Sequence, residues 1–128
     1  MRLLLDTHVL LALIEGRKAG LPAGVEALLK DADNEHHLSA ASLWEIAIKW
    51  RLGKLRLTPA LGTLPELLRG IGIQIVPINE YHALAAVEPE PATRDPFDRM
   101  LLAQCEIENL KLVTLDHGLR GHRLAVRV

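Results

Sequence analysis

The apolar positions of the chain follow two alternating periods. Short, almost continuous apolar runs, such as "RLLLD" at 2–6, are typical of strands buried on both faces of a sheet. Segments with apolar residues three and four positions apart, such as "SLWEIAIKWRLG" at 42–53, are typical of amphipathic helices. The pattern predicts strands at residues 2–6, 36–40, 73–78, 111–116 and 123–128. It predicts helices at residues 8–16, 22–32, 42–53, 63–70, 80–88 and 96–109.

Local signals mark several helix ends. Gly16 and Gly53 each follow a helical pattern, where a glycine adopts the left-handed conformation that ends a helix. Thr63 and Glu66 have the spacing of a capping box, and we expect Gly70 to end the helix that they begin.

The stretch "RDPFDRMLLAQ" opens a predicted apolar helix after the turn-rich loop at 89–94. Asp95 is a natural N-cap, and Pro96 would be the first helical residue, where its missing N–H costs nothing. Asp98 would be the third helical residue, where a carboxylate complements the helix dipole. These positions explain both aspartates without a function, so the question is whether they also do chemistry.

The alternation of strands and helices predicts an α/β fold in one domain, residues 1–128. We expect a three-layer α/β/α sandwich with a central, mainly parallel sheet covered on both faces. In such folds, functional residues gather at the carboxyl edge of the sheet.

Composition narrows the class of protein. Of the 128 residues, 49% are hydrophobic and 24% are charged, which is typical of a globular domain. The formal net charge of −1 argues against nucleic-acid binding through a broad basic surface.

The apolar runs are shorter than the roughly 20 residues of a membrane span, so we expect no membrane segment. Asp6 and His8 interrupt the N-terminal run, which argues against a signal peptide. The single cysteine, Cys105, fits a core residue in a reducing, cytoplasmic compartment.

Acidic residues fall where the predicted strands end and the helices begin. Asp6 ends the first strand, Asp116 ends the strand at 111–116, and Glu45 lies in an early turn of the helix at 42–53. Asp95 and Asp98 open the helix at 96–109. All five are expected at the carboxyl edge, and they can therefore meet in one cleft.

Each acid also has a purely structural interpretation. Asp6 can cap the helix that follows it, and Asp116 can be a turn residue beside Gly118. Glu45 can complete a capping box that begins at Ser42, or pair with Lys49 four residues later.

Taken together, the structural interpretations explain less, because the acids interrupt otherwise apolar runs such as "LLLD" and "LWEIAI". A cluster of carboxylates needs a cation or raised pKa values to persist. Arg99 is the one basic residue within these runs, and it points about 100° away from Asp98 on a helix. An all-oxygen set favours Mg²⁺, with Mn²⁺ as the alternative, over zinc.

Four motifs, "LLLDTHVLL", "SAASLWEIAIK", "RDPFDRMLLAQ" and "LVTLDHGL", together resemble a PIN domain, in particular the VapC-type toxins of bacterial toxin–antitoxin pairs. The resemblance implies a metal-dependent endoribonuclease that hydrolyses RNA phosphodiester bonds. It implies that the catalytic and metal-binding residues are Asp6, Glu45, Asp98 and Asp116. Asp95 belongs to a variant of the third motif and is treated as a helix cap or a supporting residue.

The resemblance also implies partners. They are an RNA substrate, a second copy of the chain in a homodimer, and a cognate antitoxin that inhibits the nuclease. Thr7 and Thr114 resemble small hydroxyl residues beside the family's acids, where they orient a carboxylate or a water, or serve only local backbone structure. His117 is expected near the cleft without a required role.

Several assignments stay open. The basic residues that follow Glu45 either guide RNA toward the acids or form a solvated face. They are Lys49, Arg51, Lys54 and Arg56. Trp44 and Trp50 are interpreted as core or dimer contacts rather than as platforms for base stacking.

The alternative functions are a non-catalytic interaction module with the PIN fold and a DNA-directed, metal-dependent nuclease. A phosphotransfer enzyme with Asp6 as nucleophile is disfavoured, because His8 stands where haloacid-dehalogenase-like phosphatases have a second aspartate.

Overall fold

The centre of the molecule is a four-stranded sheet in the order β3-β2-β1-β4. We describe residues 1–16 and 20–128 of a computed structural model of the chain. The strands are β1 (Arg2–Leu5), β2 (Glu35–Ser39), β3 (Ile73–Val76) and β4 (Lys111–Val113). Every pair of neighbouring strands is parallel, which confirms the predicted α/β class.

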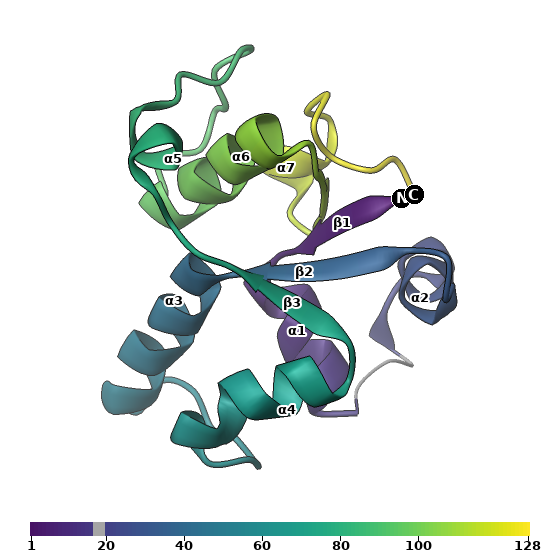
Figure 1. The fold of residues 1–128 in the computed structure, drawn as a ribbon, viewed down its shortest axis with the longest axis vertical. Coiled ribbons are helices and arrows are strands. Elements are labelled where there is room, and N and C mark those ends of the chain that lie inside the picture. The colour runs from purple at the N-terminus through teal and green to yellow at the C-terminus, as the bar shows by residue number, and fades with distance from the viewer. Residues whose placement is uncertain (17–19) are drawn as a thin grey trace.

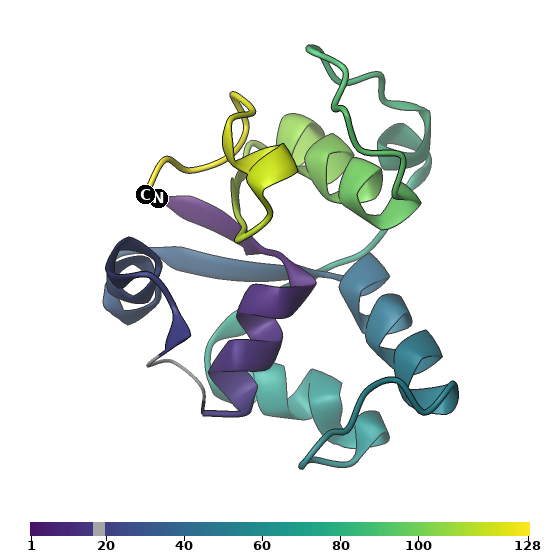
Figure 2. The same cartoon turned by 180° about the vertical axis from the view of Figure 1, so that it is seen from behind.

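Helices cover both faces of this sheet, so the sandwich has three layers. Figures 1 and 2 show α5, α6 and α7 on one side of the strands and α1 and α4 on the other. The helical segments are α1 (Thr7–Ile14), α2 (Ala23–Lys30), α3 (Ala40–Arg51), η2 (Leu61–Thr63), α4 (Leu64–Gly70), α5 (Glu80–Leu84), α6 (Pro96–Glu108) and α7 (His117–Arg120). In the part of the chain that the structure describes, no helix has the length and apolar character needed to cross a bilayer.

The continuous apolar run of β1 reflects burial on both faces. Leu3 and Leu5 belong to the core shared with α1 and α4, whereas Leu4 belongs to the core under α6 and α7. All three leucines are fully buried. Because successive strand residues point to opposite faces, a strand between two helix layers needs apolar residues at every position.

The C-terminal segment differs from its prediction. Residues 123–128 form no strand, and only Ala125 makes an isolated bridge, to Leu112. The Arg123 side chain is bonded instead to the carbonyl of Glu88 and the carboxylate of Glu106. The short helix α7, which was not predicted, begins directly after Asp116.

The observed helix ends agree in part with those predicted from the sequence. Gly16 and Gly53 have positive φ values of 71° and 72°, as predicted for residues that end a helix. Gly70 lies inside α4, and Gly72, with φ 89°, is the left-handed residue instead. The capping box at Thr63 is wrong, because η2 runs into α4 and leaves Thr63 in a helical conformation. Its hydroxyl donates to the carbonyl of Ala60 at 2.6 Å.

Candidate metal-binding active site

A pocket of about 110 Å³ lies at the carboxyl edge of the sheet, where α1, α3, α6 and α7 begin. The structure brings all five predicted acids together in its wall. The lining residues are Asp6, Thr7, His8, Glu45, Lys49, Asp95, Asp98, Leu101 and Asp116. Strand ends and helix starts from four separate motifs therefore meet in one place.

Asp6 is held at the joint between β1 and α1. It is the N-cap of α1, and its Oδ1 accepts a hydrogen bond from the backbone N–H of Val9 at 2.9 Å. Its exposure is only 6%. The predicted capping role of Asp6 is thus confirmed. The capping hydrogen bond uses one of its two carboxylate oxygens.

Glu45 lies in the second turn of α3, which begins two residues earlier than predicted. Ser39 caps α3, and its Oγ accepts from the N–H of Ala41 at 2.9 Å. Ser42 is therefore inside the helix, so the predicted capping box of Ser42 and Glu45 is wrong. Because Glu45 is not needed as a cap, its carboxylate is free to face the pocket.

Both oxygens of Glu45 are engaged. Oε1 accepts a hydrogen bond from the Thr7 hydroxyl at 2.7 Å, and Oε2 lies 2.8 Å from Lys49 Nζ. The Thr7 contact matches the expectation that a small hydroxyl residue orients a carboxylate. The ion pair with Lys49 matches the predicted pairing four residues apart on one helix.

The start of α6 holds Asp98 as the sequence predicts. Asp95 is the N-cap, accepting from the N–H of Phe97 at 2.9 Å, and Pro96 is the first helical residue. The pKa of the Asp98 carboxyl is raised from its ordinary value of 3.8 to about 6. Burial is the main cause, followed by the charge of Asp95.

Sequence reasoning missed Thr93, which ties these two aspartates together. Its hydroxyl donates to Asp98 Oδ2 at 3.1 Å and accepts from the backbone N–H of Asp95 at 3.1 Å. The signal was a threonine two residues before an N-cap, the spacing of a local side-chain turn. The hydrogen bond to the carboxylate lowers the Asp98 pKa and so partly opposes the effect of burial.

Asp116 is more exposed than Asp6, Glu45 and Asp98. It is exposed, and its Oδ1 accepts from the N–H of Gly118 at 2.8 Å as the N-cap of α7. The expected local role beside Gly118 is confirmed. Thr114 accepts from the N–H of Asp116 at 3.0 Å, which is a local role. His117 is exposed on α7.

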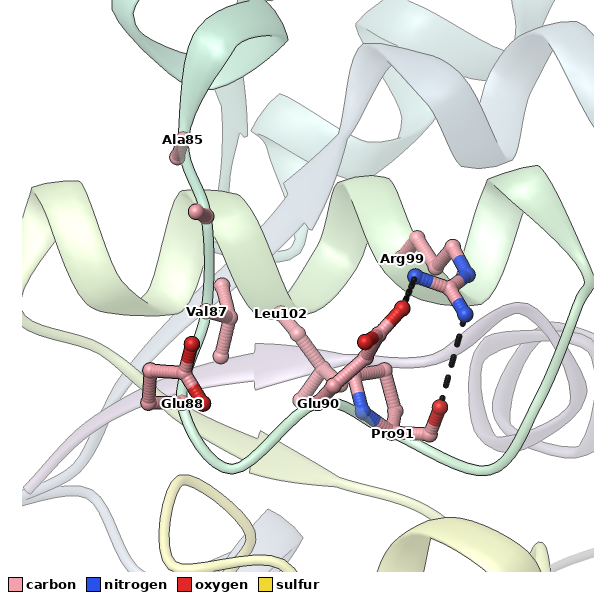
Figure 3. Close-up of a pocket in the computed structure, with 8 residues that line it drawn as sticks. Ala85, Val87, Glu88, Glu90, Pro91, Arg99 and Leu102 are labelled. Carbon is pink, nitrogen blue, oxygen red and sulfur yellow. Dashed lines mark hydrogen bonds and ion pairs between the residues drawn. The ribbon is translucent and has the colours of Figure 1, made fainter.

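The positive charge of the pocket comes from Lys49. Arg99 turns away from the acids, and its guanidinium bonds to the carbonyl of Thr93 at 3.0 Å and to Glu90 at 3.2 Å. Figure 3 shows Arg99 reaching toward Glu90 and Pro91 in a neighbouring pocket. The sequence predicted both that Arg99 points away from Asp98 and that Lys49 pairs with Glu45, and the structure agrees with both.

The pocket fits a hard divalent cation by the type of its donors. Asp116 and Asp6 also raise the pKa of Asp98, which shows that negative charge is crowded here. Carboxylates are the ligands that Mg²⁺ and Mn²⁺ prefer. In this conformation, no three His, Cys, Asp or Glu side chains among residues 1–16 and 20–128 are placed to hold a metal ion. Asp6, Asp98 and Asp116 each give one oxygen to a protein donor, so each keeps a second carboxylate oxygen for another ligand.

Two tryptophans on α3 are exposed rather than buried. Trp44 is 62% exposed and Trp50 is 46% exposed, so neither is a core residue. Trp44 contacts Phe97 edge to face, with ring centroids 5.7 Å apart, and links α3 to the start of α6. Arg51, Lys54 and Arg56 are exposed beyond the pocket. Their role in guiding RNA stays a prediction.

Comparisons with known proteins place this arrangement. A family model described as "PIN domain" matches residues 3–123. The chain is 40% identical over 57 residues to "Ribonuclease VapC16" of Mycobacterium tuberculosis (strain ATCC 25618 / H37Rv). That alignment spans 44% of this chain and 40% of the relative, so the chain matches less than half of the curated relative's length. A solved structure described as "Toxin-antitoxin complex from Klebsiella pneumoniae" superposes with a TM-score of 0.67 at 21% identity, over 96% of this chain and 94% of the other. At that identity, the likeness shows the fold.

Proposed function

This chain belongs to the PIN domain family, and from that premise we propose that it is a metal-dependent endoribonuclease, the toxin of a toxin–antitoxin pair. The observation that carries the proposal is the meeting of Asp6, Glu45, Asp98 and Asp116 in one pocket. The ribonuclease name of the partial relative and the toxin–antitoxin title of the structural match support it. The substrate is RNA, hydrolysed at its phosphodiester bonds.

Asp6 and Asp98 are the first choice for direct metal ligands, and Asp116 completes the set. Glu45 ligates as well, or orients the attacking water. Bound Mg²⁺ or Mn²⁺ supplies Lewis-acid activation of water and neutralises charge on the phosphate. Cys105 is fully enclosed in α6, and burial raises the pKa of its thiol to about 12. It is therefore no candidate for a protein nucleophile, which agrees with water as the attacking group.

The surrounding hydroxyls and backbone N–H groups hold the acids in place. Thr7 fixes Glu45, Thr93 fixes Asp98, and the start of α1 fixes Asp6. Such hydrogen bonds to charged groups are short and directional, so they limit the number of rotamers that each carboxylate samples. Catalysis of this kind depends on positioning, because the reacting atoms must be aligned before water attacks.

We place the activity in the cytoplasm and expect two protein partners. One is a cognate antitoxin with a peptide arm that lies in or near the acidic pocket. The other is a second copy of this chain. Several large apolar side chains on and near α3 and α5 are exposed, and they are available for such an association. They are Trp44, Trp50, Leu52, Tyr81 and Leu84.

The test is incubation of the purified protein with total bacterial RNA and with a DNA oligonucleotide, each with and without Mg²⁺ or Mn²⁺. Asp98→Asn is run alongside, with its fold checked by circular dichroism. We expect RNA cleavage that needs the metal and is lost in the variant. Cleavage of DNA alone would support a DNA-directed nuclease. An absence of both cleavage and metal-induced stabilisation would support a non-catalytic module.

A further inference from the structure

Lys49 is the residue with a permanent positive charge in the wall of the acidic pocket. It lies in the last turn of α3, one turn after Glu45, and the two side chains share a face of the helix. Its Nζ contacts Glu45 Oε2 at 2.8 Å. The Lys49 side chain is 38% exposed, whereas that of Glu45 is 12% exposed. The ammonium therefore contacts a largely enclosed carboxylate, while the lysine side chain itself remains partly exposed in the pocket wall.

An ammonium group has three N–H donors, and Lys49 uses one of them on Glu45. Glu45 does not depend on Lys49 alone for its position, because Thr7 holds its other oxygen. The four-carbon stem of lysine lets the charge move by several ångströms while its backbone stays in the helix. Lys49 is thus free to turn toward a ligand without releasing Glu45 from Thr7.

A phosphodiester carries a negative charge, and five carboxylates line the pocket that it must enter. Any phosphate that approaches their oxygens is repelled unless a cation stands nearby. Arg99, a guanidinium on the same helix as Asp98, is committed to Thr93 and Glu90 and is not in the pocket wall. Lys49 is therefore placed to supply this chain's own contribution to phosphate attraction.

We propose that Lys49 is a substrate-binding residue whose ammonium turns from Glu45 to a non-bridging oxygen of the RNA phosphate. This inference rests on the proposed nuclease function and adds a residue to it. The ion pair with Glu45 is the resting position of the side chain. When RNA is bound, the charge of Lys49 is shared between Glu45 and the phosphate.

The simplest competing explanation is that Glu45 and Lys49 only stabilise a helix. The chain offers a matched pair for comparison, Glu26 and Lys30 on α2, also four residues apart, with N and O atoms 2.7 Å apart. Lys30 is 64% exposed and is not in the pocket wall. A merely structural Lys49 should behave like Lys30 when either residue is replaced by glutamine.

The experiment measures binding of a fluorescein-labelled, mixed-sequence single-stranded RNA by anisotropy, in Mg²⁺, over a series of salt concentrations. All variants carry Asp98→Asn so that the RNA is not consumed. Each phosphate contact contributes about 0.7 to the slope of log affinity against log salt for single strands. We expect Lys49→Gln to reduce this slope by about 0.7 and to weaken binding about tenfold at low salt. Lys49→Arg should restore the slope, and Lys30→Gln should leave it unchanged.

The thermal midpoint of each variant is measured first, and Lys49→Met, which keeps the aliphatic stem, replaces Lys49→Gln if the latter fails to fold. A folded Lys49→Gln whose affinity and salt slope equal those of Lys30→Gln overturns the proposal. A separate incubation of total RNA with protein that retains Asp98 distinguishes a failure of the Lys49 proposal from a failure of the proposed nuclease function. Metal-dependent RNA cleavage with an unchanged slope removes only the role of Lys49, whereas the absence of both cleavage and metal-induced stabilisation removes the nuclease function itself.

Discussion

The Thr7 hydroxyl and the Glu45 carboxylate lie 2.7 Å apart, although 38 positions separate them in the chain. This hydrogen bond joins the start of α1 to the second turn of α3 across the carboxyl edge of the sheet. It holds one acid of the pocket from a residue adjacent to another, Asp6. The geometry of the acidic set is therefore maintained by contacts between elements as well as within each helix.

Replacement of Thr7 by valine keeps the shape of the side chain and removes the donor to Glu45. We expect a loss of about 1–2 kcal/mol in the free energy of unfolding, because a partly buried carboxylate loses a hydrogen bond. RNA cleavage should fall at least about tenfold, since Glu45 gains rotamers. Both quantities are measured on one preparation, by urea titration and by cleavage rate.

Thr58→Val is the matched control, because the Thr58 hydroxyl donates to Glu15 at 3.0 Å on an exposed surface outside the pocket. That variant should keep full cleavage. Equal cleavage by Thr7→Val and Thr58→Val would contradict a positioning role for Thr7.

The raised pKa of Asp98 predicts how stability changes with pH in the absence of metal. The folded state holds the Asp98 proton more tightly than the unfolded state, with a pKa of about 6 against 3.8. The stabilisation associated with this proton is complete below about pH 4 and is lost as the pH rises through about 6. The carboxyl is partly exposed, so we expect solvent screening to limit the effect to about 1 kcal/mol.

Urea unfolding in EDTA at pH 5 and pH 7.5 measures this effect. Asp98→Asn should lose less stability than the wild type between the two pH values. Asp33→Asn, at an exposed acid outside the pocket, should keep the wild-type difference. A wild type whose change with pH equals that of Asp98→Asn would show that Asp98 is not the source.

Two substitutions of Asp6 separate its capping role from its charge. Asparagine caps helices as well as aspartate, whereas alanine costs about 1 kcal/mol at an N-cap. We expect Asp6→Asn to remain about as stable as the wild type in EDTA, and Asp6→Ala to be less stable. Both should lose the stabilisation by Mg²⁺, about 2.7 kcal/mol for the wild type at 100 times the dissociation constant.

Thermal unfolding with and without Mg²⁺ provides the measurement. If Asp6→Asn kept the full Mg²⁺-dependent shift, Asp6 would be a cap and not a ligand.

Asp95 should behave in the opposite way, as a residue that builds the helix but does not ligate. Asp95→Asn keeps an acceptor for the N–H of Phe97, so the free energy of unfolding should stay close to that of the wild type. The rate of RNA cleavage should stay within about twofold. Asp95→Ala should lower stability by about 1 kcal/mol through loss of the cap. Loss of cleavage in a folded Asp95→Asn would instead assign Asp95 to the metal site.

The sequence is most informative where both faces of an element are buried. The apolar runs of β1 and β4 locate those strands. Asp6 is the first polar residue after β1, and Asp98 is the first polar residue after Pro96 at the start of α6. The parallel sheet then follows from the alternation of elements, and the shared pocket follows from the sheet.

Other features depend on tertiary contacts that no local pattern reveals. "RLAVRV" at 123–128 alternates like a strand, yet Arg123 is held by Glu88 and Glu106, and pairing stops at one bridge. Ser39 and Ser42 are equally good caps by type, and the end of β2 selects Ser39. The place of Lys49 in the pocket wall depends on which face of α3 turns inward.

The joints at Asp6 and Ser39 leave no spare residue between strand and helix, since α1 starts at Thr7 directly after Asp6 and α3 starts at Ala40 directly after Ser39. One residue inserted into either helix beyond its joint would rotate all later positions by about 100°. An insertion just before Glu45 would thus turn Glu45 away from both Thr7 and the pocket. A residue inserted in the connection at 52–60, none of which lines the pocket, would leave both joints as they are, so the number of residues from strand to acid matters more than the length of the chain between the elements.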